Sequence, residues 1–440
     1  MFRLRSFPGT LLLLALALLT GGVAAQQLDG IERDRWFAML KNIHAELKKN
    51  YFDENFKGVD MEARFNQAEE KIRAATTSGQ ARSAIAWMLD GLNDSHTFFV
   101  PPRSTASYDY GWTMDMIGDA CRITAVRPKS DAEKQSVKPG DEILKLNGYK
   151  PTRADLWKMR YFFHVLQPQP ALRLELRSPD GSVRTVSPLA RMRERAAALE
   201  SEWDLFDIFR EIQNDDRARE SRYIELGEDL MIWSMSDFLI TEDMADGMMG
   251  KARQHKALIL DLRGNHGGYV KTLNRLVGNF FENEIKLWDR VGRKEKAKDL
   301  RPEIAKPRGK IFTGKLIVLV DSGSASAAEL FPRIVQLERR GTVIGDVTSG
   351  AVMESIGRSY EMGVYSVVPY AASITHADLI MSDGKTLEHA GVTPDERMLP
   401  TAADMAAGRD PVLAHAAELL GVKLTPEAAG KLFPVRWVKP

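Results

Sequence analysis

The chain has a single cysteine, Cys121, among 440 residues, so it cannot form an intrachain disulfide and must be stabilised by packed cores. Its 61 basic and 60 acidic residues nearly cancel, which gives no reason to expect nucleic acid or an anionic surface as a partner. The eight histidines are scattered, without a His-x-x-x-His pair or a cysteine cluster. We therefore expect no metal site and no cofactor.

Long apolar runs are also missing beyond the first 25 residues. Residues 1–25 themselves place Arg3 and Arg5 before the apolar run 11–19, and small residues at 21–25 follow. This order is typical of a secretory signal peptide cleaved after Ala25, and the run is short for an uncleaved membrane anchor, the other interpretation. The mature chain is expected to be exported, periplasmic or extracellular, without an integral membrane segment.

The region 26–104 has a helical pattern. Apolar residues recur at three- and four-residue spacing in three stretches, which predicts three amphipathic helices: Trp36, Leu40, Ile43 and Leu47; Phe65, Ala68 and Ile72; Ile85, Met88, Leu89 and Leu92. Ser95 and His96 come directly after the third stretch, between turn-forming residues and the apolar segment 98–100.

The region 105–190 is predicted to be a compact β-rich module. Its clearest segment is 137–148, where a Pro-Gly turn leads into a strand that ends in Asn-Gly. The segment resembles a PDZ signature, which implies binding of an extended peptide near Gly111, Trp112 and Thr113. A purely structural or gating role for the module is a second interpretation. Residues 191–222 are dense in charge and are interpreted as a linker.

The rest of the chain is organised around two strand-to-turn junctions. The apolar run 316–320 ends at Asp321-Ser322-Gly323, and small residues with three serines then favour the start of a helix. A second apolar run, 257–262, ends in the glycine-rich turn 264–268. Both junctions can lie at the carboxyl edge of one sheet. We therefore predict a mixed α/β fold, with a core of mostly parallel strands at 223–400 and a helical cover at 401–440.

The motifs DLRGNHGG, VDSGSASAAEL and VIGDVTSGA together resemble the C-terminal processing (tail-specific) peptidases and their tricorn-core-like relatives. The resemblance implies a serine peptidase acting on peptides or unfolded proteins. It also places the nucleophile at the serine before Ala-Ala-Glu, which is Ser326. The simpler interpretation is that these serines only cap a helix.

The resemblance leaves the proton acceptor to be assigned. Where the processing peptidases have the lysine of a Ser/Lys dyad, this chain has Ala351, which cannot accept a proton. Lys385 is a conceivable substitute in an exposed turn. The tricorn-type arrangement instead implies a tetrad in which His96 is the base and Ser95 and Glu388 orient it.

Backbone N–H groups of Gly267, Gly268 and Ala327 are predicted to form the oxyanion hole. Two other functions stay open alongside the peptidase. One is a catalytically inactive family member that binds a peptide or another ligand, because Ala351 breaks the commoner dyad. The other is an esterase-type hydrolase that uses the same serine.

Overall fold

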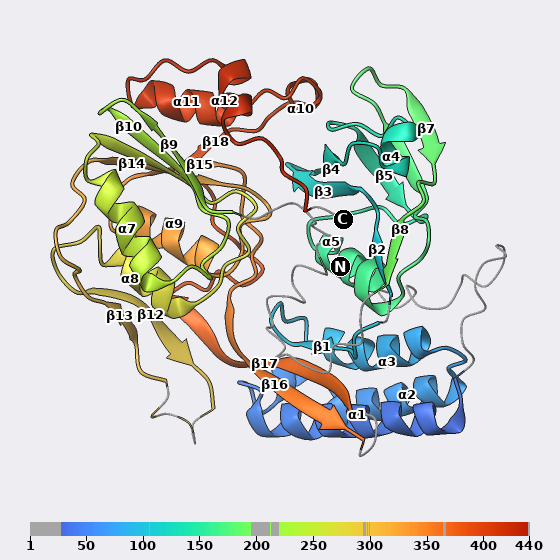
Figure 1. Ribbon diagram of the computed structural model, residues 1–440. Helices are drawn as coiled ribbons and strands as arrows, with labels where there is room; N and C mark the ends of the chain where they lie inside the picture. The colour runs from blue at the N-terminus through green and yellow to red at the C-terminus, as the bar shows by residue number, and fades with distance from the viewer. Residues whose placement is uncertain are drawn as a thin grey trace, which may run out of the picture.

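The computed structural model describes residues 28–104, 106–194, 212, 220–293, 296, 298, 300–363 and 367–438. The predicted signal peptide and most of the predicted linker lie outside these ranges. Figure 1 shows a helical layer at the bottom, an α/β core on the left and a β-rich module on the right, with the last helices above the core. The mixed α/β fold predicted from the sequence is confirmed.

The N-terminal helices form because their apolar spacing and caps agree. Side chains of Asp29, Asp60 and Thr77 accept hydrogen bonds from first-turn amides and so fix the three starts. The helices pack into one apolar cluster with the underside of a neighbouring sheet, which includes Phe99 and Tyr370. They are α1 (Gly30–Asn50), α2 (Met61–Ala74) and α3 (Ser78–Asp90), with a short turn η1 (Phe56–Gly58).

The β-rich module is a five-stranded antiparallel sheet with its own apolar core. Its strands, in spatial order, are β3 (Trp112–Ile117), β4 (Ala120–Val126), β5 (Glu142–Leu146), β6 (Leu174–Arg177) and β7 (Val183–Val186). Its helices are α4 (Asp131–Lys134), α5 (Leu156–Arg160) and η2 (Tyr161–Leu166). Strand β2 (Ala106–Asp109) pairs with β8 (Arg191–Glu194), so regular structure continues four residues into the predicted linker.

The core is a six-stranded sheet in which four neighbouring pairs are parallel, as predicted. One edge strand is antiparallel to its neighbour. In spatial order the strands are β18 (Glu396–Arg397), β15 (Thr342–Gly345), β14 (Lys315–Val320), β11 (Ala257–Asp261), β10 (Leu230–Ser234) and β9 (Arg222–Leu226).

Helices cover both faces of this sheet, which explains its continuous apolar runs. One face packs against α7 (Glu242–Ala252), α8 (Val270–Val277) and α9 (Ala327–Leu337). The other face packs against α11 (Pro411–Leu419) and α12 (Pro426–Leu432). Helix α10 (Ala402–Ala406) precedes these two helices in the C-terminal segment.

A second, antiparallel sheet joins the core to the helical layer and was missed from the sequence. Its long strand β17 (Val368–Met381) pairs with β1 (Phe98–Val100), β12 (Ile285–Val291) and β16 (Met353–Met362). Strand β13 (Glu303–Ala305) completes it beside β12. Because β1 follows the Ser95-His96 segment directly, this sheet carries that segment to the core (Figure 1).

A group of polar residues around Asp346 joins the β-rich module to the core. The Arg153 side chain forms an ion pair with Asp346 and donates to the Val347 carbonyl at 3.0 Å. Asp346 also accepts from the Gly118 amide at 2.8 Å, and only 3% of its side chain is exposed. The module is thus held against the loop that follows β15. None of the helices in the described ranges combines the length and apolar character needed to cross a membrane.

Candidate active site

The two strand-to-turn junctions lie side by side because β11 and β14 are parallel neighbours. The Asp321 carboxylate ties them together by accepting from the amides of Gly264 at 2.8 Å and Gly323 at 2.9 Å. The hydroxyl of Ser324 donates to the Leu262 carbonyl at 2.8 Å. Burial, helped by the Asp115 charge, raises the pKa of Asp321 to about 6.

Ser326 occupies the position between this turn and helix α9. It has a φ of 57° and a ψ of −120°, a conformation that a non-glycine residue rarely adopts. Strain of this kind costs about 1–3 kcal/mol and persists at functional sites where the surroundings enforce it. A strained strand-to-helix turn is also how other hydrolases expose a nucleophilic serine.

The Glu329 carboxylate enforces this conformation from beneath. It accepts from the Ser326 amide at 3.1 Å, from Thr348 Oγ1 at 2.6 Å, and from the amides of Gly350 and Ala351 at 2.7 and 2.9 Å. Its side chain is fully buried, and this burial raises the pKa of Glu329 to about 7 against the effect of the four donors. Glu329 had no predicted role, although an acidic residue among apolar residues in the first turn of a helix was the available signal.

The glycine turn lies against Ser326 so closely that a side chain at Gly267 would not fit. A Cβ on Gly267 would lie 2.7 Å from Ser326 Cβ. The Gly267 amide donates to Asn265 Oδ1 at 2.8 Å and is therefore occupied. Within the described ranges the amides of Gly268 and Ala327 have no acceptor. Of the three predicted oxyanion donors, these two fit the role better, and the oxyanion hole itself stays a prediction.

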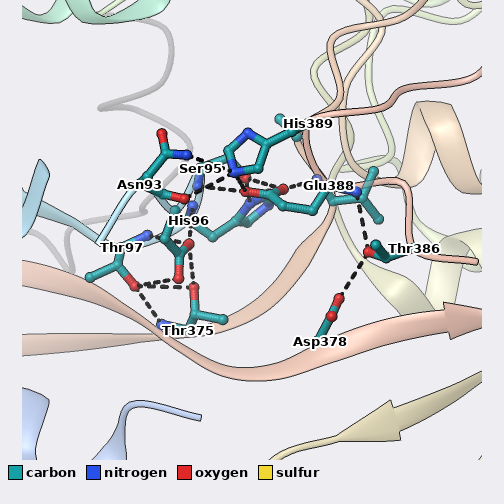
Figure 2. Close-up of polar contacts among 12 residues, drawn as sticks. Asn93, Ser95, His96, Thr97, Thr375, Asp378, Thr386, Glu388 and His389 are labelled. Carbon is teal, nitrogen blue, oxygen red and sulfur yellow. Dashed lines mark hydrogen bonds and ion pairs between the residues drawn. The ribbon is translucent and has the colours of Figure 1, made fainter. Parts of the chain in front are cut away.

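The predicted base and its partners form a continuous hydrogen-bonded chain (Figure 2). Ser95 Oγ lies 2.7 Å from His96 Nδ1 and 2.8 Å from Glu388 Oε2. Because a carboxylate has no proton to give, the single hydroxyl proton goes to Glu388, and Ser95 accepts from Nδ1–H. His96 is thereby held in the tautomer whose Nε2 is free to take a proton.

Further contacts hold the carboxylate in place. The amides of Ser95 and Val352 each donate to Glu388 at 2.9 Å, and 6% of its side chain is exposed. His389 Nε2 lies 2.9 Å from the Asn93 carbonyl, which connects the Glu388 loop to the turn before Ser95 (Figure 2).

Asp94 supports the histidine turn from the opposite side and was also missed. Its carboxylate accepts from the His96 amide at 2.9 Å and from Thr375 Oγ1 at 2.8 Å. The hydroxyl of Thr97 lies at 3.2 Å from the same carboxylate (Figure 2). The available signal was an acidic residue two positions before His96 in the sequence.

Ser326 and His96 line one cleft of about 900 Å³ between the core, the helical layer and the β-rich module. Burial lowers the pKa of His96, while the charges of Glu388 and Asp94 oppose that shift. The imidazole is therefore mostly neutral near pH 7 and able to act as a base.

A lysine base does not fit this cleft. Among the described residues that line it, the only lysine is Lys158, whose ammonium pairs with Asp90 at 2.7 Å. Lys385 lies in an exposed turn and is not one of those residues. Ala351 does line the cleft, and its backbone is used instead: its carbonyl accepts from the Ser326 amide at 3.0 Å.

The residues predicted to bind peptide in the β-rich module are engaged within the module. The Gly111 amide donates to Asp109 Oδ1 at 2.9 Å, Thr113 Oγ1 contacts Thr124 Oγ1 at 2.8 Å, and Trp112 is buried. None of the three is among the described residues lining the cleft. Their role as a peptide site stays a prediction. No group of acidic, histidine or cysteine side chains within the described ranges could hold a metal ion.

Comparison with known proteins identifies the core. Residues 230–398 match peptidase family S41, a range that contains both junctions, Ser326 and Glu388. The core belongs to peptidase family S41. The resemblance inferred from the sequence motifs is confirmed, and relatives of both the tail-specific and the tricorn type are found among similar proteins.

Three curated relatives represent these two types. A tail-specific protease of Haemophilus influenzae is 24% identical over 352 residues, covering 74% of this chain and 46% of its own length. The putative tricorn protease homolog 2 of Streptomyces coelicolor is 31% identical over 163 residues, covering 37% of this chain and 13% of its own length. The carboxy-terminal processing protease CtpA of Bacillus subtilis is 24% identical over 330 residues, covering 71% of this chain and 62% of its own length. The chain thus spans less than two thirds of the length of each of these relatives.

Among solved structures, mature CPAF complexed with lactacystin is similar with a TM-score of 0.61 at 14% identity. The match covers 86% of this chain and 96% of the CPAF chain. At this identity the similarity shows a shared fold.

Proposed function

We propose that this S41 protein is an exported serine peptidase that uses Ser326 as nucleophile and His96 as general base. The observation that carries the proposal is the Glu388–Ser95–His96 chain, which leaves Nε2 of the imidazole as the free acceptor in the cleft that also contains Ser326. Export is part of the proposal because residues 1–25 have the order of a signal peptide.

The proposed reaction follows from these positions. His96 Nε2 takes the Ser326 hydroxyl proton as Oγ attacks the scissile carbonyl, and later gives that proton to the leaving amine. Glu388, acting through Ser95, stabilises the imidazolium that forms in between. The amides of Gly268 and Ala327, together with the N-terminus of α9, stabilise the oxyanion. Each such donor typically contributes about 3 kcal/mol to lowering the barrier.

The inactive alternative is disfavoured by the strain at Ser326. A scaffold that only binds ligand has no need to hold a serine at a φ of 57° with a four-donor carboxylate beneath it. The esterase stays an alternative, because small esters form the same acyl-enzyme.

Cleavage of an unfolded, fluorescently labelled protein tests the proposal. We expect Ser326→Ala to reduce cleavage to background and Ser322→Ala, which alters the neighbouring hydroxyl that donates to the Met116 carbonyl at 2.6 Å, to retain it. Equal loss in both variants would move the nucleophile away from Ser326. Turnover of small esters without any cleavage of unfolded protein would favour the esterase.

A further inference from the structure

His389 links the two halves of the candidate active site, and its backbone is strained. It has a φ of 60°, and Asn93, which lies beside it among the residues that line the cleft, has a φ of 46° (Figure 2). A non-glycine residue adopts this left-handed conformation rarely, and mostly where its surroundings enforce it. The backbone and the side chain of His389 each make a contact that accounts for the conformation.

The backbone of His389 contacts the nucleophile side of the site. Its amide donates to the Gly350 carbonyl at 2.8 Å. The Gly350 amide in turn donates to Glu329, the carboxylate beneath Ser326, at 2.7 Å. A Cβ on Gly350 would lie 3.0 Å from the His389 carbonyl carbon, so the two backbones pack directly together. The His389 backbone is therefore fixed to the loop at 348–351, which holds the nucleophile.

The imidazole of His389 contacts the base side, at the histidine turn (residues 93–97). Nε2 lies 2.9 Å from the Asn93 carbonyl (Figure 2). Because a carbonyl can only accept, Nε2 carries the proton and donates it. The ammonium of Lys57 donates to the same carbonyl at 3.1 Å, whereas His389 Nε2 is 3.6 Å from Glu388 Oε1. The imidazole thus binds the turn that carries His96 rather than the neighbouring carboxylate.

This hydrogen bond adds a constraint that Glu388 alone does not give. Within the described ranges the other hydrogen bonds between the two segments end on the Glu388 carboxylate, at 2.9 Å from the Ser95 amide and 2.8 Å from the Ser95 hydroxyl. A glutamate side chain is flexible, so its carboxylate can follow the turn if the turn moves. The imidazole instead extends from a fixed backbone, and its bond to a backbone carbonyl sets the separation of the two segments.

We propose that His389 is a positioning residue, which fixes the distance between His96 and Ser326 by joining the histidine turn to the loop at 348–351. The inference rests on the proposed function for the reaction that the site performs, and it names the contact that assembles the site. His389 itself transfers no proton. Loss of its hydrogen bond is expected to lower kcat with little change in KM, because the spacing of base and nucleophile affects the reaction more than it affects binding.

Two amide variants of His389 separate a positioning role from a purely structural one. The glutamine amide can reach the place of Nε2 and donate to Asn93, whereas the shorter asparagine cannot. Asparagine, however, tolerates a positive φ better, so relief of backbone strain alone would favour His389→Asn.

We expect His389→Asn to lower kcat about tenfold and His389→Gln to stay within about threefold of the parent, since only the asparagine variant loses the hydrogen bond. Peptide cleavage and thermal unfolding are measured on both proteins. An asparagine variant at least as active as the glutamine variant, in line with its backbone preference, would overturn the inference.

The titration of His96 in the Ser326→Ala protein provides a readout that needs no turnover. Burial lowers the pKa of His96, and the charges of Glu388 and Asp94 oppose that shift. If the histidine turn moves away from Glu388, this opposing effect weakens. We therefore expect the midpoint, measured by NMR, to fall when His389→Asn is added and to stay close to the parent value with His389→Gln. Equal midpoints in all three proteins would overturn the inference.

The two proposals can fail separately. A His96 midpoint that falls in His389→Asn but not in His389→Gln, together with no cleavage by the unmodified protein, would support the positioning role and reject the peptidase. Cleavage that depends on Ser326 and His96, but has the same kcat in both His389 variants and the parent, would support the peptidase and reject the positioning role.

Discussion

Replacing His96 by alanine is expected to lower kcat about 10⁴-fold, with a much smaller change in KM. The reason is that His96 is held by Ser95 and Glu388 as the free base of the cleft, and no lysine among the described cleft residues is available to replace it. Steady-state cleavage of a fluorogenic peptide measures both constants. His415→Ala is the matched control, because His415 pairs with Glu396 at 2.6 Å on the outer helix α11.

The pH profile adds a signature that loss of folding would not give. Because burial lowers the pKa of His96, the acid limb of kcat/KM should lie below the ordinary histidine value of about 6.5. Glu388 opposes that shift, so Glu388→Gln should move the limb to still lower pH while reducing kcat. An unchanged limb in Glu388→Gln, or a profile without an acid limb, would contradict the assignment of His96.

Glu329→Gln is expected to reduce kcat about 10²-fold and to change how stability depends on pH. In the variant, an NH₂ group replaces one carboxylate oxygen and cannot accept the hydrogen bonds that this oxygen received. The donors on the Ser326 backbone and in the loop at 348–351 are therefore displaced. Two measurements from pH 4 to pH 8 check this prediction: peptidase activity for the change in kcat, and denaturant-induced unfolding for the change in stability. Glu338→Gln at the exposed end of the same helix is the control.

The direction of the pH effect follows from the pKa of Glu329, which is about 7 in the folded protein against 4.5 ordinarily. Between pH 4.5 and pH 7 the folded protein keeps the Glu329 proton, whereas the unfolded protein has released it. The free energy of unfolding therefore falls as the pH rises through this range, and what protonated Glu329 contributes below pH 4.5 is lost above pH 7. The loss amounts to about 3 kcal/mol. Glu329→Gln should lack this decline, and an identical slope in both proteins would contradict the account.

The two junctions beside Ser326 were predictable because their signals are local, whereas the choice of Ser326 as nucleophile came from the family resemblance. The apolar runs before Asp261 and Asp321 predict buried parallel strands, and the carboxyl ends of such strands share one edge, so the two turns had to be neighbours. The serine-rich helix start followed from the same short segment. Nothing local, however, indicated that Ser326 has a positive φ, since the Glu329 carboxylate that holds this conformation is itself fixed by the distant loop at 348–351.

The base was not predictable from local pattern. Ser95 and Glu388 are 293 positions apart, and their contact depends on β1 pairing with β17. Strand β17 was missed because its segment, VPYAASITHADLIM, is buried on both faces at its centre and lacks the alternation that marks a half-exposed strand. His96 and Glu388 were therefore reached through the family resemblance, and the contacts of Asp94 and Glu329 became visible only in the fold.

Labelling with a fluorophosphonate tests the central claim most directly, because it identifies the residue that forms the covalent adduct. The account predicts a single adduct on Ser326 by peptide mass spectrometry, formed rapidly in the unmodified protein and at least 10²-fold more slowly in His96→Ala. An adduct on Ser322 or Ser324 instead, or labelling of Ser326 at the same rate without the imidazole, would contradict it.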